Sequence, residues 1–271
     1  MATGSVSAHR SVSVLLAQLE PQPDDLRANM ASAVALLEEH PEASLAVFPE
    51  VFLSGSLQGA NAIVLTDPAS PLVALQNSAR RHATAVIVGV AEKTPQGVAN
   101  TAVCIDENGE IVGRYQKVHL FGNESRFFAV GDSYLVTMLA GIKVAPIICY
   151  DVEFPEPARA VATAGADLLV TIAANMDPYA DDHALFLQVR ALENRLPHVY
   201  VNRVGRESNF VFCGASGVAD ASGRLVASLG PYAPEVRLVE IAIGESPQPG
   251  YLADLRTGIP VNESIPSRSH R

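Results

Sequence analysis

Short β-branched and aliphatic runs alternate with amphipathic segments along the chain, and this alternation limits the possible folds more than any other feature. In residues 24–39, apolar side chains recur at helical spacing at Leu26, Met30, Val34 and Leu37, which predicts a helix with one buried face. Further helices are predicted over 72–81, 155–164 and 182–195. Strands are predicted over 12–19, 45–48, 85–91, 101–106, 111–117, 143–149, 166–173, 198–204, 215–220, 224–229 and 237–243. This pattern favours two packed sheets covered by helices.

The composition is that of a globular protein, with 48% hydrophobic and 18% charged residues in a chain of 271. No repeat, linker or low-complexity block divides the chain, so we expect one domain over 1–271 with its core in about 12–243. The net charge of −10 argues against nucleic acid or an anionic membrane as a partner, because both would repel the average surface.

Membrane insertion and secretion are not expected. No apolar stretch approaches the ~20 residues that a spanning helix needs. Residues 1–13 are polar, and the apolar run 14–17 is too short for the core of a signal peptide. The expected location is therefore the cytoplasm.

The C-terminal segment, residues 244–271, is rich in Pro, Gly and Ser. It also contains Tyr251, Leu252, Leu255 and Ile259, which are too few to form a core of their own. We therefore expect it to dock on the body of this subunit or on a neighbouring one.

Three predicted strands end in an ionisable residue, at Glu50, Lys117 and Cys149. Strand ends are where rigid scaffolds present catalytic groups. Each residue alone also has an ordinary interpretation: a solvated acid, a surface lysine and a buried small hydrophobe. Lysine is nevertheless an uncommon choice in this protein, because the chain has three lysines and sixteen arginines.

The surroundings of Cys149 argue against a simple core position. Polar residues Tyr150, Asp151 and Glu153 follow it and lead into a predicted helix. Free backbone N–H groups and a positive helix end at such an elbow would favour the thiolate. The other cysteines, Cys104 and Cys213, are interpreted as packing residues, and the absence of a C-x-x-C pair argues against a disulfide framework or a zinc ribbon.

Other catalytic patterns fit less well. The sequence contains no G-x-S-x-G, no H-E-x-x-H and no phosphate-binding glycine loop. Its histidines show no metal-ligand spacing. Cys149 with His183 or His198 as base, a thiol-protease arrangement, stays an alternative without a local signature.

Taken together, three motifs resemble those of the nitrilase superfamily of carbon–nitrogen hydrolases. They are Phe48-Pro49-Glu50, residues 115–122 (YQKVHLFG) and residues 149–156 (CYDVEFPE). The order Glu, Lys, Cys matches, and so do the separations of 67 and 32 residues. The resemblance runs from about residue 12 to at least residue 243, and it includes Asn175 and the segment 190–194 (RALEN).

Within the superfamily, the chain is similar to the aliphatic-amidase-like branch and to 5-aminopentanamidases. The motif at 149–156, the segment 174–179 (ANMDPY) and the late segment 251–256 (YLADLR) carry this likeness. One departure is Ser56, where such enzymes often have a tyrosine, and it bears on the size and shape of the substrate. The resemblance implies an α/β fold, a four-layer α-β-β-α sandwich, and a two-fold dimer in which residues 244–271 reach across the interface.

The resemblance also assigns roles. Cys149 would attack the amide carbon and form a thioester, with Glu50 as general base. Lys117 and the backbone N–H of Tyr150 would stabilise the oxyanion. Glu124 would orient the amide; a loop acid paired with Arg126 is the alternative. Asn175 and Met176 are candidate pocket walls, whereas Asp151 and Glu153 are expected to anchor the elbow.

The function that the resemblance implies is amidase activity on a small aliphatic amide, with water as second substrate and no cofactor or metal. The acidic composition weakly favours an ω-amino amide. A nitrilase or an N-carbamoyl amide hydrolase would use the same triad. A binding module that has lost activity is the alternative from another class, and the intact Glu50, Lys117 and Cys149 argue against it.

Overall fold

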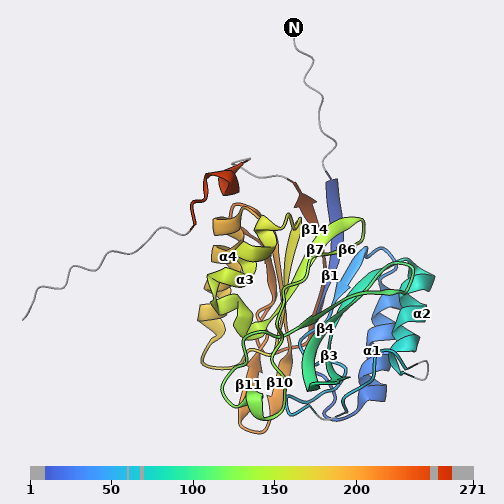
Figure 1. The fold of residues 1–271 in the computed structure, drawn as a ribbon. Coiled ribbons are helices and arrows are strands. Elements are labelled where there is room, and N and C mark those ends of the chain that lie inside the picture. Colours follow the sequence, from blue (N-terminus) through green and yellow to red (C-terminus); the bar gives the residue numbers. More distant parts are fainter. Residues whose placement is uncertain (1–9, 60, 68–69, 245–249, 258–271) are drawn as a thin grey trace, which may run out of the picture.

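The computed structural model describes residues 10–59, 61–67, 70–244 and 250–257, which form four layers of secondary structure. Two large sheets pack face to face in the centre, and a pair of helices covers the outer face of each (Figure 1). The predicted four-layer α-β-β-α sandwich is confirmed.

The first sheet has the strand order β14-β1-β2-β3-β4-β5. Its strands are β1 (Arg10–Gln18), β2 (Leu45–Val47), β3 (Ala85–Thr94), β4 (Gly97–Ile105), β5 (Ile111–Gln116) and β14 (Glu235–Ile243). Side chains alternate along β1: Val14 and Leu16 join the core between the sheets, whereas Leu15 and Ala17 join the core under the helices. Helices α1 (Leu26–Glu39) and α2 (Leu72–His82) cover that outer face.

The second sheet has the strand order β13-β12-β9-β8-β7-β6. Its strands are β6 (Thr137–Leu139), β7 (Ile142–Ile148), β8 (Leu168–Ala173), β9 (His198–Asn202), β12 (Gly217–Ala219) and β13 (Leu225–Ser228). Helices α3 (Pro155–Thr163) and α4 (Ala180–Asn194) pack on its outer face. β7, β8 and β9 are parallel, so their carboxyl ends share one edge of the sheet.

The strand predicted over 198–204 is wrong in its second part. β9 ends at Asn202, and a separate hairpin follows, made of β10 (Val204–Glu207) and β11 (Phe210–Cys213). The break falls at Arg203, whose buried guanidinium lies 4.1 Å from the centre of the Phe212 ring and 3.0 Å from Glu207 Oε2. Burying this guanidinium requires partners that a continuous strand would not supply. The sequence interpretation also missed β6, β11 and all of β10 beyond Val204.

The described part of the C-terminal segment lies beside α4. A 3-10 turn, η3 (Tyr251–Asp254), places Leu252 against the main core. The guanidinium of Arg195 lies 4.8 Å from the centre of the Tyr251 ring. This part therefore docks on its own subunit, and Ile259 lies outside the described residues. Among the described helices, none has both the length and the apolar character to cross a bilayer.

The loop after β2, which carries Glu50, packs tightly against β3 at Gly89. A Cβ atom at Gly89 would lie 2.3 Å from Val51 N and 2.4 Å from Pro49 O. Two hydrogen bonds join the same backbones, Gly89 N to Pro49 O and Leu53 N to Gly89 O. The position of Glu50 therefore depends on a residue without a side chain at Gly89.

We predict that Gly89→Ala destabilises the protein by roughly 1–3 kcal/mol, because overpacking forces the backbone of the Glu50 loop to move. Thermal denaturation measures the effect. Gly230→Ala is the matched control, since the nearest atom to a Cβ there is Glu235 Oε2 at 3.8 Å. A Gly89→Ala protein that melts with the wild type would contradict the close approach.

Candidate active site

The three strand ends that the sequence singled out meet at one cavity. Glu50 follows β2, Lys117 follows β5, and Cys149 follows β7 as the first residue of a 3-10 turn, η2 (Cys149–Glu153). All three line the cavity together with Glu124 from η1 (Glu124–Arg126). The fold therefore brings together residues that lie 67 and 32 positions apart in the chain.

Three of the residues that line the cavity form a buried ion network. Lys117 Nζ lies 2.7 Å from Glu50 Oε1 and 2.9 Å from Glu124 Oε1. The side chains of Lys117 and Glu50 are each 1% exposed. Burial by itself would lower the pKa of Lys117, but the carboxylates of Glu50 and Glu124 outweigh it and raise that pKa. Lys117 is therefore a fixed positive charge, not a titrating base.

Both oxygens of Glu50 are held by donors. Oε1 also accepts from Asn100 Nδ2 at 2.7 Å, and Oε2 accepts from the backbone N–H of Ala174 at 2.7 Å. Sequence reasoning missed Asn100 and Ala174. A single asparagine in a strand matches no catalytic motif. Its only signal is a polar amide among the apolar residues of β4, which indicates a buried hydrogen-bond partner.

The backbone and the buried surroundings of Cys149 define an unusual thiol. Cys149 has φ of +45°, a conformation that L-residues adopt at a cost of about 1–3 kcal/mol. Burial, and then the charge of Glu50, raise the pKa of the thiol well above its usual range, while Lys117 opposes them. The expectation that the elbow favours a thiolate is therefore wrong for the free protein. The thiol keeps its proton until a base removes it.

Asp151 ties the elbow to the loop after β5. Its buried carboxylate accepts hydrogen bonds from Ile148 N at 3.0 Å, Tyr115 Oη at 2.6 Å and His119 N at 2.9 Å. The His119 ring nitrogen Nδ1 lies 2.8 Å from the same carboxylate. Glu153, the other residue expected to anchor the elbow, lines the cavity, and its Oε1 lies 3.3 Å from His183 Nε2.

The catalytic cavity is small, with a volume of about 20 Å³, which is room for about one water molecule. Besides the charged residues, its walls are Leu57, Phe121, Tyr150, Ala174, Asn175, Met176, Tyr179 and His183. Asn175 and Met176 thus lie where they were expected. Ser56 is buried beside Leu57 but is not part of the wall.

A wider hollow adjoins this cavity and shares Leu57, Phe121, Glu124 and Met176 with it. It has a volume of about 340 Å³, and the exposed rings of Phe127 and Phe210 also line it. A vestibule of this kind can admit a substrate larger than the inner cavity.

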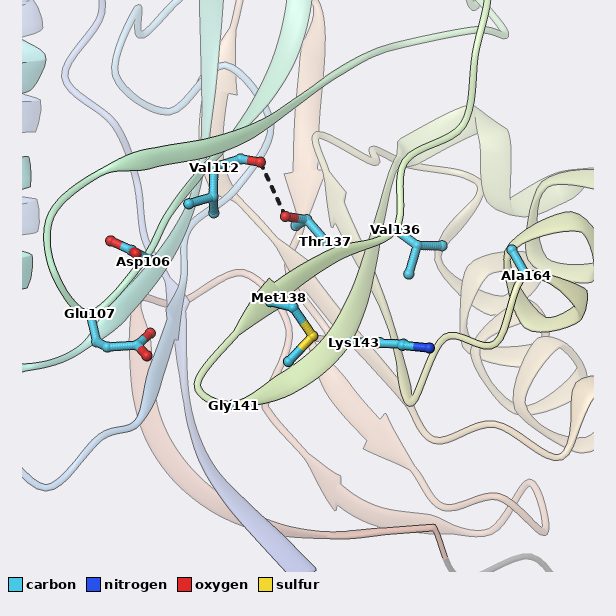
Figure 2. Close-up of a pocket in the computed structure, with 9 residues that line it drawn as sticks. All are labelled: Asp106, Glu107, Val112, Val136, Thr137, Met138, Gly141, Lys143 and Ala164. Atoms are coloured by element: carbon cyan, nitrogen blue, oxygen red, sulfur yellow. Dashed lines mark hydrogen bonds between the residues drawn. The ribbon is translucent and has the colours of Figure 1, made fainter.

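A separate concavity lies where the edge strands β5 and β6 of the two sheets meet (Figure 2). Thr137 Oγ1 donates to Val112 O across this edge at 3.1 Å. Its walls include Asp106, Glu107 and Lys143, and none of the residues of the catalytic cavity. It therefore belongs to another part of the molecule.

The two histidines considered as partners for Cys149 are already engaged. His198 is fully buried, with Nε2 2.7 Å from Thr171 Oγ1 and Nδ1 3.0 Å from Leu187 O. Burial lowers its pKa to about 4, which keeps the ring neutral. His183 lines the cavity, but its nitrogens lie 2.8 Å from Tyr200 Oη and 3.3 Å from Glu153 Oε1. This arrangement disfavours the thiol-protease alternative.

The other two thiols, Cys104 and Cys213, are free and buried. Burial raises the pKa of Cys104 to about 12 and that of Cys213 to about 11. Among the described residues, no group of three or more His, Cys, Asp or Glu side chains could hold a metal ion.

Comparison with known proteins agrees with this geometry. A profile of the carbon-nitrogen hydrolase family matches residues 14–247. The chain is 35% identical over 219 residues to an (R)-stereoselective amidase of a Pseudomonas species, which covers 79% of this chain and 80% of the relative. It is 33% identical over 238 residues to a nitrilase of Pyrococcus abyssi, covering 85% and 89%.

Among solved structures, a mutant of the amidase from Nesterenkonia sp. AN1 is similar, with a TM-score of 0.79 and 30% identity over 93% of this chain and 97% of that one. Its active-site cysteine carries the acetamide moiety of fluoroacetamide. Sequence, fold and site agree: this chain belongs to the carbon-nitrogen hydrolase family and is a hydrolase of carbon–nitrogen bonds other than peptide bonds.

Proposed function

We propose that this hydrolase is an amidase that converts small aliphatic amides, ω-amino amides among them, to carboxylate and ammonia through a thioester on Cys149. The observation that carries the proposal is the Lys117 ammonium held between Glu50 and Glu124 in the cavity that Cys149 also lines. The amidase relatives support an amide as substrate.

The first half-reaction starts with a protonated thiol. Because burial and Glu50 hold the proton on Cys149, Glu50 accepts it only as the sulfur attacks the amide carbon. A C–S bond forms, the carbonyl becomes a tetrahedral oxyanion, and Glu50 then gives the proton to the amide nitrogen. The C–N bond breaks and ammonia leaves, so the thioester remains on Cys149.

Charge on the oxyanion is stabilised by fixed donors. Two N–H groups of the Lys117 ammonium are directed to Glu50 and Glu124, and the third is available for the substrate. The backbone N–H of Tyr150 lies in the first turn of η2, where helical N–H groups lack acceptors within the helix. Both donors are in place before the reaction, which is the condition for strong stabilisation of the transition state.

Glu124 is suited to orient the amide. Burial raises the pKa of Glu124 and the charge of Glu50 raises it further, whereas the charge of Lys117 lowers it. One oxygen is held by Phe121 N at 2.8 Å and the other by Lys117. In the second half-reaction a water molecule takes the place of ammonia, and Glu50 removes its proton as the oxygen bonds to the thioester carbon. The C–S bond then breaks, Glu50 returns the proton to the sulfur of Cys149, and the acid leaves and loses its own proton to solvent.

A nitrile and an N-carbamoyl compound are the competing substrates for the same triad, and relatives named as nitrilases, such as that of Pyrococcus abyssi, favour the nitrile. A panel of short amides, ω-amino amides, ureido acids and nitriles, assayed for ammonia, separates them. Ammonia from amides without turnover of the matching nitriles supports the proposal. Carbon dioxide from a ureido acid would identify a carbamoyl hydrolase, and no turnover of any member would favour the inactive binding module.

We predict that Cys149→Ala abolishes turnover and leaves the melting temperature within a few degrees of the wild type, because alanine removes only the thiol. Mass spectrometry of the wild type with a slow substrate should show an acyl adduct on Cys149. Cys104→Ala and Cys213→Ala serve as controls and should retain the adduct. An adduct on either of those two cysteines in the wild type would refute the assignment.

We predict that Lys117→Ala lowers kcat by roughly 10²-fold or more, as expected for loss of an oxyanion donor. Lys117→Arg should not restore activity, because a planar guanidinium cannot replace a compact ammonium between Glu50 and Glu124. Steady-state assays measure both. Lys143→Ala removes an exposed lysine and is the control. Activity of Lys117→Ala within a few-fold of the wild type would count against the role.

We also propose that the protein forms a two-fold dimer through a self-complementary, largely apolar interface that includes the C-terminal segment. The exposed side chains of Leu185, Leu192, Tyr251 and Leu255 support such an interface. Deletion from Gly250 onward should shift the dimer toward monomer or lower its melting temperature. Light scattering on the full chain and the truncated chain tests this, and a full-length monomer at micromolar concentration would refute the dimer.

A further inference from the structure

The catalytic cavity is too small for most of a substrate, and this constrains where the acyl group lies. Its volume of about 20 Å³ holds at most the reacting end of an amide, beside Cys149. The vestibule has a volume of about 340 Å³, within the range of roughly 300–1,000 Å³ that is typical of small-molecule sites. The two spaces share Leu57, Phe121, Glu124 and Met176. An acyl chain that leaves the catalytic cavity between these shared walls enters the vestibule.

The charges on the wall of the vestibule are balanced. Two of the described residues that line it are charged, Glu124 and Glu207, and the side chain of each is 14% exposed. Glu124 lies 2.9 Å from Lys117 Nζ, and Glu207 lies 3.0 Å from Arg203 Nη1. The other polar residues of the wall are uncharged: Gln58, Asn123 and Ser208. An ionised acyl group would lose water here without a free counter-charge, which is costly, so the wall favours an uncharged group.

Two phenylalanine rings of the vestibule are exposed although they line a hollow beside the catalytic cavity. Phe127, directly after η1, is 42% exposed, and Phe210, the first residue of β11, is 43% exposed. Leu57, Phe121 and Met176 extend this apolar surface to the catalytic cavity. Removal of apolar surface from water is favourable, and aromatic rings also attract other rings. The wall therefore suits an aryl or branched alkyl group.

Hydrogen bonds and an ion pair hold this wall in place without a ligand. Glu207 Oε1 accepts from Leu57 N at 2.9 Å, and Glu207 Oε2 lies 3.0 Å from Arg203 Nη1. The Arg203 guanidinium lies 4.1 Å from the centre of the Phe212 ring, and a backbone bridge joins Phe212 to Met176. Leu57 and Met176 are thus both tied to the hairpin of β10 and β11. A preformed wall lowers the entropic cost of binding.

We infer that the vestibule is an acyl-binding subsite that selects primary amides whose acyl group ends in an uncharged aryl or branched alkyl group. The amide lies at Cys149, and the apolar end contacts Phe127 and Phe210, which are the specificity-determining residues. The inference rests on the proposed amidase function and specifies its substrate class, since a primary amide extends only through its acyl group. Contacts this far from the reacting atoms act on the substrate and the transition state alike, so they lower KM more than they raise kcat.

Three amides test the inference: propanamide, 3-phenylpropanamide, which adds an aryl end, and 3-(4-carboxyphenyl)propanamide, which adds a charge to that end. A single methylene in an apolar pocket changes kcat/KM by roughly 10-fold or more. We therefore expect wild-type kcat/KM to be at least about 10-fold higher for 3-phenylpropanamide than for either of the others, mainly through KM.

Variants of the two exposed rings identify the surface responsible. Phe127→Ala and Phe210→Ala should each lower the ratio of kcat/KM for 3-phenylpropanamide to that for propanamide by roughly 5-fold, because each removes apolar contact with the aryl end. Leu225→Ala is the matched control. It removes a side chain of β13 that is 46% exposed and lies outside the vestibule, and it should leave that ratio unchanged.

Two outcomes overturn the inference alone. One is equal wild-type kcat/KM for propanamide and 3-phenylpropanamide, which is the result expected if a second copy of the chain covers the vestibule. The other is full preference for the aryl amide in both phenylalanine variants. If those variants do not fold, benzyl alcohol should compete with 3-phenylpropanamide in the wild type whereas benzoate does not, and equal effects would overturn the inference. Absence of ammonia from every amide, short ones included, would instead refute the proposed amidase function, and the inference with it.

Discussion

The ammonium of Lys117, buried between the carboxylates of Glu50 and Glu124, is the interaction on which the rest of the site depends. Removing charges from water is costly, and a buried ion network is tolerated only when its remaining hydrogen-bonding groups are satisfied. The side-chain amide of Asn100 and the backbone N–H of Ala174 donate hydrogen bonds to the carboxylate of Glu50. The backbone N–H of Phe121 donates one to the carboxylate of Glu124. These donors come from β4, from the end of β8 and from the loop after β5. The network therefore links the two sheets, because Glu50 follows β2 of the first sheet and Ala174 follows β8 of the second.

The same network determines the state of the thiol. Cys149 lies next to a carboxylate and away from water, and both conditions favour the neutral form. A free thiolate would be a hazard in a resting enzyme, because thiolates are the form that oxidants and electrophiles attack. In the proposed reaction the proton leaves the sulfur only as Glu50 accepts it, so nucleophilicity would arise together with the bond to substrate. Under this proposal the reactivity of Cys149 would depend on the substrate being in place.

Periodicity predicted the elements of the sandwich, and the order of three short motifs predicted the residues of the site. Helix α2 was predicted over 72–81 and runs over Leu72–His82, because its apolar side chains repeat at helical spacing. The hairpin of β10 and β11 was missed, because the break at Arg203 follows from a buried guanidinium that stacks on Phe212, a long-range contact without a local pattern. The thiolate of Cys149 was predicted wrongly, since helix-end arguments consider local dipoles and omit the burial and the Glu50 charge that tertiary structure adds. Asn100 was missed because its role exists only once β4 lies beside the Glu50 loop.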